Sequence, residues 1–369
     1  MKKDTLKREL DWVSMLVPLA IVLTVCALFM IFPEGSKLVL SVVRGFLGDD
    51  FGLYYALLGV GIVGCTLYIA FSKFGKIKLG DCEKPQYRSF QWGTMIFTST
   101  MAADILFYSL CEWALYANES QVEMMGGMQK WASTYPLFHW GPIAWGFYIV
   151  LAVAFGFMIH IRGRDKQKFS EACRPLLGSR VDGVLGRVID LTAIFALIAG
   201  TATTFSLATP LLSRAISHVF GLQDSIGLTI AILLMIAAVY TFTVWFGMKG
   251  IAKLAAICSY CFFALLAYVL FGGGETRYIL ETGFSAIGNL VQNFIGLSTW
   301  MDPLRETSFP QNWTIYYWAY WMLCDTVLYW RDQQGTHDPQ YHSRRLRLGA
   351  CRDVYLVHYP WKLRPCAAA

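Results

Sequence analysis

Long apolar stretches separated by short polar segments dominate this 369-residue chain. A helix needs about 20 consecutive apolar residues to cross the hydrocarbon core of a bilayer. Eight stretches reach or approach that length, so we expect membrane-spanning helices near residues 12–32, 52–72, 92–117, 137–161, 188–211, 227–246, 254–273 and 313–329. The pattern therefore predicts an all-α polytopic membrane protein surrounded by a lipid bilayer.

Composition and the distribution of basic residues support this class. The chain is 56% hydrophobic and 15% charged, with a mean hydropathy of +0.46, which is typical of a membrane protein rather than a soluble enzyme. Lys and Arg concentrate in residues 2–8, 73–88 and 162–187, whereas the segments 118–136 and 274–312 are more acidic. Because short cytoplasmic loops carry an excess of Lys and Arg, we expect the basic segments and the N-terminus to be cytoplasmic. The net charge of +6 then reflects topology and indicates no nucleic-acid partner.

Common motifs for catalysis and for metal binding are absent apart from one C-x-x-C pair. The chain contains no phosphate-cradling glycine loop, His-Glu-x-x-His motif or nucleophile elbow. Cys258 and Cys261 have C-x-x-C spacing, but they lie in an apolar stretch without neighbouring His or acidic residues. We interpret them as small core residues rather than as a redox or metal site. The sequence therefore predicts a protein that is not an enzyme and that carries no cofactor.

Aromatic side chains gather in two of the predicted spans. The stretch Tyr-Pro-Leu-Phe-His-Trp-Gly-Pro-Ile-Ala-Trp-Gly-Phe-Tyr at 135–148 places three large rings inside a membrane helix, and a second cluster occupies 313–321. Two such clusters facing each other would form an aromatic box, which binds quaternary ammonium cations through cation–π contacts. The alternative is an aromatic belt at the membrane interface, which is common in membrane proteins.

Three ordered motifs resemble the betaine/carnitine/choline transporter (BCCT) family. They are WGTMIFTSTMAADILFYSLCE at 92–112, FHWGPIAWGFY at 138–148 and FPQNWTIYYWAYW at 309–321. The resemblance implies a LeuT-type fold, in which two inverted five-helix repeats follow two extra N-terminal helices and the substrate lies at the midplane. It also implies secondary transport of quaternary ammonium compounds such as choline, glycine betaine or carnitine across the bacterial cytoplasmic membrane. Na⁺ or H⁺ is the implied coupling ion, and a homotrimer is the implied assembly.

This template divides the chain into five parts. We expect a cytoplasmic N-terminus with two peripheral helices, the first five-helix repeat, an extracellular or interfacial connection, the first helix of the second repeat, and a basic tail. These parts correspond to residues 1–91, 92–273, 274–311, 312–329 and 330–369. The chain would then hold about eight of the twelve or so helices that the resemblance implies.

The resemblance also assigns the residues of the aromatic box. Trp140, Trp145 and Tyr148 match its first half. The second half falls on Tyr320 and Trp321, where the family usually has two tryptophans. One wall of the implied box is therefore altered to tyrosine.

A carboxylate replaces a glycine of the family motif in the third predicted span. Many family members carry Gly-Met-Gly-Ile-Gly where this chain has Thr-Met-Ala-Ala-Asp at 100–104. An ionisable group within a membrane span is costly and marks a functional site by default. Asp104 could pair with a cation that lacks its own carboxylate, such as choline, or could carry a coupling proton. A structural, internally hydrogen-bonded carboxylate is the alternative.

Two further polar residues accompany these motifs. Glu112 matches a family glutamate at the end of its helix, and we interpret it as a helix-tethering group, with a role in the transport path as the alternative. His139 precedes the first tryptophan of the predicted box. We interpret it as a capping or packing group rather than a proton relay.

The composition changes abruptly after about residue 325. Residues 330–369 hold seven Lys or Arg, three Asp and three His, where the resemblance implies further spans. With free choice of synonymous codons, a one-base shift from about Thr326 permits a peptide that looks like the family's continuation. The alternative function for this chain is therefore a truncated frameshift product without transport activity.

Overall fold

The computed structural model describes residues 12–77, 90, 108–109, 111–164, 168–223 and 225–304. In chain order its elements are α2 (Trp12–Ile31), α3 (Pro33–Arg44), η1 (Gly45–Asp50), α4 (Gly52–Phe71), η2 (Lys73–Lys76), α6 (Ser120–Met124), α7 (Met128–His139), α8 (Pro142–Gly156), η3 (Phe157–Ile161), α9 (Phe169–Leu177), η4 (Gly178–Asp182), α10 (Val184–Phe220), α11 (Ile226–Trp245), α12 (Gly247–Gly272) and α13 (Thr276–Ser298). A further helical stretch covers residues 111–117. Every regular element of this described part is a helix, which confirms the all-α class.

Five of the described helical segments are long and apolar enough to cross a membrane. They are Gly52–Phe71, Met128–Ile161, Val184–Ala202, Ile226–Thr243 and Lys253–Gly272, and Leu16–Ile31 forms a shorter apolar helix. These six segments coincide with six of the eight predicted spans. The third predicted span is described only toward its end, and the eighth lies outside the described residues.

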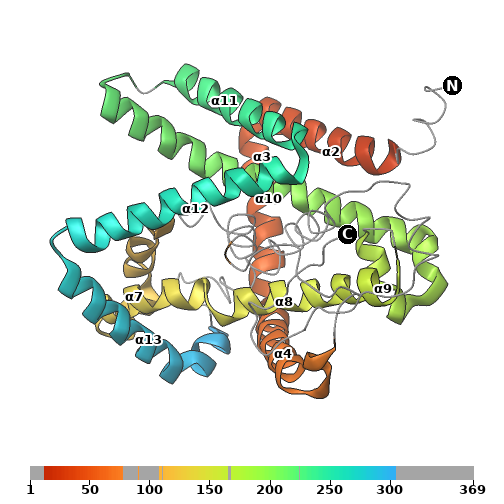
Figure 1. The fold of residues 1–369 in the computed structure, drawn as a ribbon, viewed down its shortest axis with the longest axis horizontal. Coiled ribbons are helices and arrows are strands. Elements are labelled where there is room, and N and C mark those ends of the chain that lie inside the picture. Colours follow the sequence, from red (N-terminus) through yellow and green to blue (C-terminus); the bar gives the residue numbers. More distant parts are fainter. Residues whose placement is uncertain are drawn as a thin grey trace.

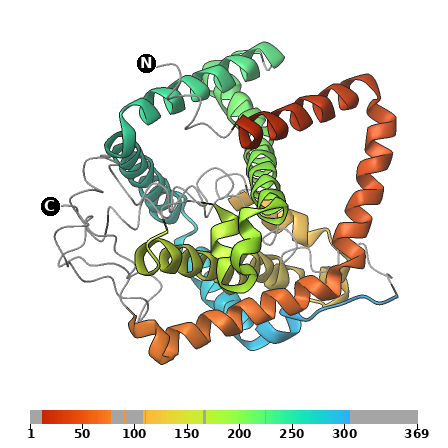
Figure 2. The same ribbon diagram turned by 90° about the vertical axis from the view of Figure 1, so that its right-hand side faces the viewer.

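The outer helices expose apolar side chains, as helices in lipid do. In α11 the apolar window is only 6% buried, and in α4 and α12 it is 11% buried. Figure 1 shows α10, α11 and α12 following one another with a turn of the chain between them. Contacts link α10 to α11, α11 to α12 and α2 to α10. Figure 2 shows that the chain from α2 through α3 to α4 runs along the periphery of the molecule. Because lipid tails are themselves apolar, these helices can expose apolar side chains to the bilayer without the polar surface that a soluble protein needs.

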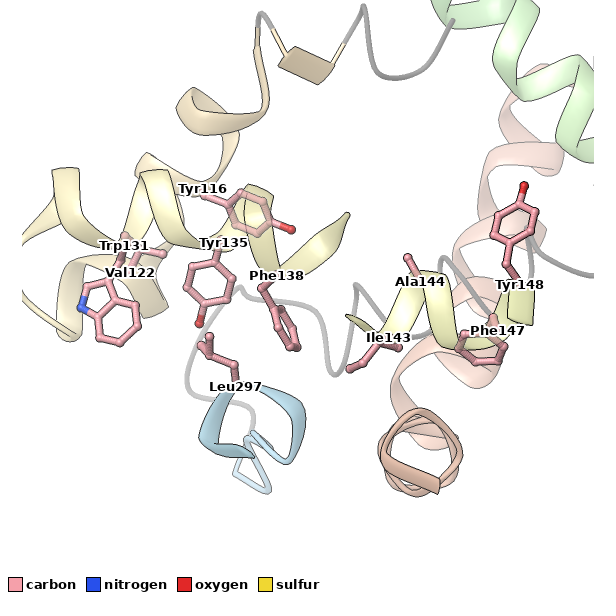
Figure 3. Packing of buried hydrophobic residues seen from close by; sticks show 10 residues of the cluster. All are labelled: Tyr116, Val122, Trp131, Tyr135, Phe138, Ile143, Ala144, Phe147, Tyr148 and Leu297. Atoms are coloured by element: carbon pink, nitrogen blue, oxygen red, sulfur yellow. The ribbon is translucent and has the colours of Figure 1, made fainter. Parts of the chain in front are cut away.

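The packed core runs along α7 and α8, with α13 packed on α7 and α4 packed on α8. Tyr135 and Phe138 of α7 lie against Leu297 of α13, and Tyr116 stacks on Tyr135 with ring centroids 4.9 Å apart (Figure 3). The phenol of Tyr148 points away from this group, at the other end of the cluster. The core therefore braces the start of α8, which carries the predicted aromatic residues.

A polar pair joins α7 to α13 inside this core. The amide Nδ2 of Asn289 donates to the hydroxyl of Thr134 at 2.9 Å, and both side chains are buried. Thr134 in turn donates to the backbone carbonyl of Lys130. Because buried polar groups cost free energy unless they are paired, this contact fixes the register of α13 on α7.

Ion pairs fasten the basic segment between α8 and α10. Arg174 donates to both oxygens of Glu171 and of Asp182, at 2.6 to 2.9 Å. The hydrogen bonds to Asp182 have the largest effect, followed by those to Glu171, and together they hold the pKa of the Arg174 guanidinium above its usual value. The carboxylate of Asp190 on α10 accepts from both the backbone N–H and the hydroxyl of Ser170. The segment is thus pinned to the beginning of α10.

Candidate functional site

Trp140 lies at a break between α7 and α8. Its backbone N–H donates to the carbonyl of Pro136 at 3.0 Å, which closes α7, and Pro142 begins α8 at a position where no N–H is required. Between the helices, a Cβ added to Gly141 would lie 2.3 Å from the carbonyl oxygen of Leu137. Only glycine fits there. The predicted span at 137–161 therefore begins in the last turn of α7 and continues as α8 and η3, and the break sits beside a predicted site residue.

The next two predicted site residues lie on α8. Trp145 and Tyr148 are three positions apart, so they share one face of the helix, and their ring centroids are 6.1 Å apart. Tyr148 is buried and Trp145 is half-buried. On α4, the hydroxyl of Thr66 donates to the carbonyl of Gly146 at 3.4 Å, and a Cβ at Gly146 would lie 3.0 Å from Ile62. The close approach of α4 fixes how α8 presents its aromatic residues.

A buried carboxylate contacts the two residues that precede the helix break. In the helical stretch 111–117, Glu112 is only 4% exposed, and its Oε2 accepts from the indole Nε1 of Trp140 at 2.8 Å. Its Oε1 lies 2.5 Å from Nδ1 of His139. The hydroxyl of Tyr116 lies 3.3 Å from the same Nδ1. These contacts join Glu112 to two residues at the end of α7, as the tethering interpretation expects, and His139 is buried beside it.

Tyr108 adds an aromatic ring that the sequence interpretation missed. Its ring centroid lies 6.0 Å from that of Trp140 and 6.3 Å from that of His139. His139 and Trp140 themselves stack, with centroids 5.4 Å apart. The available signal was spacing, because Tyr108 precedes Glu112 by four residues and thus shares its helix face.

The structure therefore tests only half of the predicted box. It describes Trp140, Trp145 and Tyr148. Asp104, Tyr320 and Trp321 lie outside the described residues. Of the described three, Trp145 and Tyr148 lie together, while Trp140 has its ring contacts with Tyr108 and His139. The complete aromatic box remains a prediction.

The cysteine interpretation needs a correction. Cys258 and Cys261 are exposed on α12 rather than buried in a core. They lie in an apolar window of α12 of which only 11% is buried, so their side chains would face lipid in a bilayer. Within the described residues, no group of three or more His, Cys, Asp or Glu side chains could hold a metal ion.

These observations define an α-helical multi-pass membrane protein with aromatic side chains at a broken helix. The chain matches the sequence model of the family described as "BCCT, betaine/carnitine/choline family transporter" over residues 13–328, and it belongs to that family. The resemblance found in the motifs is thereby confirmed.

Curated transporters of three bacteria are similar to this chain. The glycine betaine transporter OpuD of Bacillus subtilis (strain 168) is 28% identical over 300 residues, covering 79% of this chain and 58% of the relative. A probable glycine betaine transporter of Desulfitobacterium hafniense (strain Y51) is 30% identical over 295 residues, with the same coverage. The uncharacterized transporter YeaV of Escherichia coli (strain K12) is 28% identical over 270 residues, covering 72% and 55%. The chain thus spans a little over half the length of these curated relatives.

Proposed function

We propose that this protein serves secondary transport of quaternary ammonium compounds such as choline, glycine betaine or carnitine. The observation that carries the proposal is the aromatic pair Trp145 and Tyr148, held at the start of a membrane helix directly after the break at Trp140. A trimethylammonium head beside such rings gains roughly 0.5 to 2 kcal/mol for each desolvated cation–π contact. Tyr320 and Trp321 are the proposed opposite wall. The similarity to a glycine betaine transporter and to a probable glycine betaine transporter supports this class of substrate.

The same proposal includes the orientation of the protein in the membrane. The N-terminus and the pinned basic segment around Arg174 lie on the cytoplasmic side of the bacterial plasma membrane, as the distribution of Lys and Arg indicates. The helices of 92–273 form the first of two inverted repeats, and 312–329 begins the second. Na⁺ or H⁺ drives the movement, and the protein assembles as a homotrimer. These assignments rest on the family membership and the sequence pattern.

The first test compares two ligands of the same shape. Purified protein in lipid nanodiscs is expected to bind choline at least about tenfold more tightly than 3,3-dimethylbutan-1-ol, its uncharged isostere. A preference of about 1.4 kcal/mol corresponds to that factor and lies within the range of one or two cation–π contacts. The measurement is displacement of radiolabelled choline. Equal displacement by both ligands would contradict a cation-selective aromatic site.

We propose further that Asp104 favours cations without their own carboxylate. Its anionic side chain would attract choline and would repel the carboxylate of glycine betaine. Asp104→Gly, which restores the family's usual residue, is expected to shift the ratio of choline to betaine binding toward betaine, or to abolish any pH dependence. Competition curves for both ligands at two pH values measure this. If neither selectivity nor pH response changes, Asp104 is structural.

One observation favours a second candidate. The family match ends at residue 328, and the strongly basic composition of 330–369 follows. The second candidate is therefore that a chain of this sequence does not transport. Uptake of radiolabelled choline by cells that express it and lack other such transporters decides between the two candidates, since accumulation above background contradicts the second.

A further inference from the structure

We propose that Glu112 is a positioning residue for substrate binding, which sets the orientation of the Trp140 indole and is itself held by His139. This inference rests on the proposed function, because it assigns Trp140 a ligand. It goes beyond a structural tether between helices, since it predicts that loss of the carboxylate changes ligand affinity through one particular ring.

The geometry uses both oxygens of the carboxylate. Oε2 accepts from the indole N–H of Trp140 at 2.8 Å, while Oε1 lies 2.5 Å from Nδ1 of His139. Glu112 is 4% exposed and His139 is 1% exposed, whereas Trp140 is half-buried. The two groups that orient the ring are therefore shielded, and the ring that they orient retains accessible surface. This arrangement is expected where buried residues hold a ligand-binding side chain in a fixed orientation.

The hydrogen bond fixes the ring without covering both of its faces. The indole N–H lies on the edge of the ring, so a donor bond from this edge sets the side-chain rotation and leaves the π-faces to other partners. On one side the imidazole of His139 stacks at 5.4 Å and 22°. Tyr108 meets the ring at 6.0 Å with a tilt of 52°. Trp140 is thereby held at its edge by Glu112 and contacted by the neighbouring rings of His139 and Tyr108.

The charge of the acceptor matters as well as its position. A hydrogen bond to an ionised acceptor is roughly twice as strong as a neutral one, and in a buried site it is weakened little by solvent. An anion bonded to the N–H polarises the indole so that its face becomes more negative. A more negative face attracts a quaternary ammonium cation more strongly. Glu112 therefore serves both the orientation of Trp140 and its affinity for the cation.

The alternative is that Glu112 only joins two helices. A buried carboxylate is costly unless its oxygens are paired, and here His139 and Trp140 supply the pairing. Removing a purely structural tether that acts through His139 would lower stability and would affect ligand binding regardless of which residue stands at 140. Removing a positioning group would affect binding only while position 140 carries an indole N–H. A double-mutant cycle separates the two outcomes.

The experiment compares choline binding by four proteins in nanodiscs: wild type, Glu112→Gln, Trp140→Phe and the double variant. Gln preserves the size of the side chain but not its charge, and Phe has no N–H to donate. Each single variant is expected to raise the Kd for choline by roughly three- to tenfold, a factor in keeping with the loss of one charge-assisted hydrogen bond. The double variant is expected to bind no more weakly than Trp140→Phe alone. Multiplication of the two single effects would overturn the inference.

A spectroscopic signature accompanies the binding data. With ¹⁵N-labelled tryptophan, the indole N–H resonance of Trp140 is expected to shift in Glu112→Gln without any ligand. Asp190→Asn is the matched control, because Asp190 is also a buried, hydrogen-bonded carboxylate but contacts Ser170 near the basic segment. It should leave both the Trp140 resonance and choline binding unchanged. An unshifted resonance in Glu112→Gln would overturn the proposed contact.

A second variant covers the case in which Glu112→Gln does not fold. Trp140→3-benzothienylalanine replaces the indole N–H by sulfur at nearly constant shape, so it removes only the donor. It is expected to weaken choline binding by a similar factor, and unchanged binding would overturn the inference. Failure of the proposed function looks different, because the wild-type protein itself would then show no saturable choline binding.

Discussion

Trp145→Ala is expected to weaken choline binding by at least about 1 kcal/mol, which is roughly fivefold in Kd. The half-buried ring of Trp145 lies 6.1 Å from the buried ring of Tyr148, so the substitution removes one wall of the proposed site and leaves its neighbour unsupported. Both the packing contribution and the cation–π contribution are lost. Trp145→Phe should retain part of the affinity, because a smaller ring with a weaker π-face remains. Equilibrium binding of radiolabelled choline to each purified variant is the measurement.

Trp245→Ala provides the matched control for this experiment. Trp245 is the same residue type at the end of α11, and it is 85% exposed, where lipid would surround it. Its loss is expected to leave choline binding unchanged within about 0.3 kcal/mol, since surface changes away from a site have small effects. Equal weakening in both variants would point to a general loss of folded protein. Unchanged affinity in well-folded Trp145→Ala would remove Trp145 from the site.

The membrane-spanning helices were predictable because lipid imposes a simple requirement on them. The predicted span at 52–72 is observed as Gly52–Phe71, and the one at 227–246 as Ile226–Trp245. Each spanning helix needs a continuous apolar length and satisfies its own backbone hydrogen bonds. Both requirements are met by residues that are close together in the sequence. Apolar windows therefore locate such helices well.

The same windows missed helices of mixed character. α13 occupies most of the segment 274–311, which was expected only as an extracellular or interfacial connection. Its polar residues, such as Asn289, interrupt any long apolar run, yet Asn289 is buried against Thr134 of α7. A helix that packs one face on a partner needs hydrophobic periodicity rather than a continuous apolar stretch. Its partner, 155 residues earlier in the chain, is not visible in the local pattern.

The candidate site shows a similar division between local and distant information. Trp145 and Tyr148 could be paired from their spacing on one helix. Glu112 and Trp140 lie 28 positions apart, and the hydrogen bond between them depends on a packing of helices that no local pattern reveals. The sequence indicated that Glu112 tethers something, and the structure identifies the tethered groups. Tyr108 was missed because its spacing from Glu112 was the one local signal, and nothing else distinguishes it from an ordinary aromatic residue of a span.

Gly141→Ala is expected to disrupt the break between α7 and α8 more than any other small substitution near the site. The added Cβ would lie 2.3 Å from the carbonyl oxygen of Leu137 and 3.2 Å from that of Phe138. These are backbone atoms in the last turn of α7, so no side-chain rotation relieves the clash and α7 must move relative to α8. Forcing extra volume into a packed site typically costs about 1 to 3 kcal/mol. We expect lower thermal stability together with weaker choline binding, because Trp140 moves with the end of α7 and away from Glu112.

Gly288→Ala on α13 is the control that isolates this effect. A Cβ added at Gly288 meets nothing within 4 Å, and alanine is preferred to glycine inside a helix by about 0.5 to 1 kcal/mol. Stability of this variant should therefore be equal to or above that of the wild type, with unchanged choline affinity. The comparison is made by the thermal unfolding midpoint of each protein in the same detergent, followed by choline binding in nanodiscs. If Gly141→Ala unfolds at the wild-type temperature and binds choline with wild-type affinity, the break at residue 141 tolerates a side chain. The orientation of Trp140 would then not depend on it.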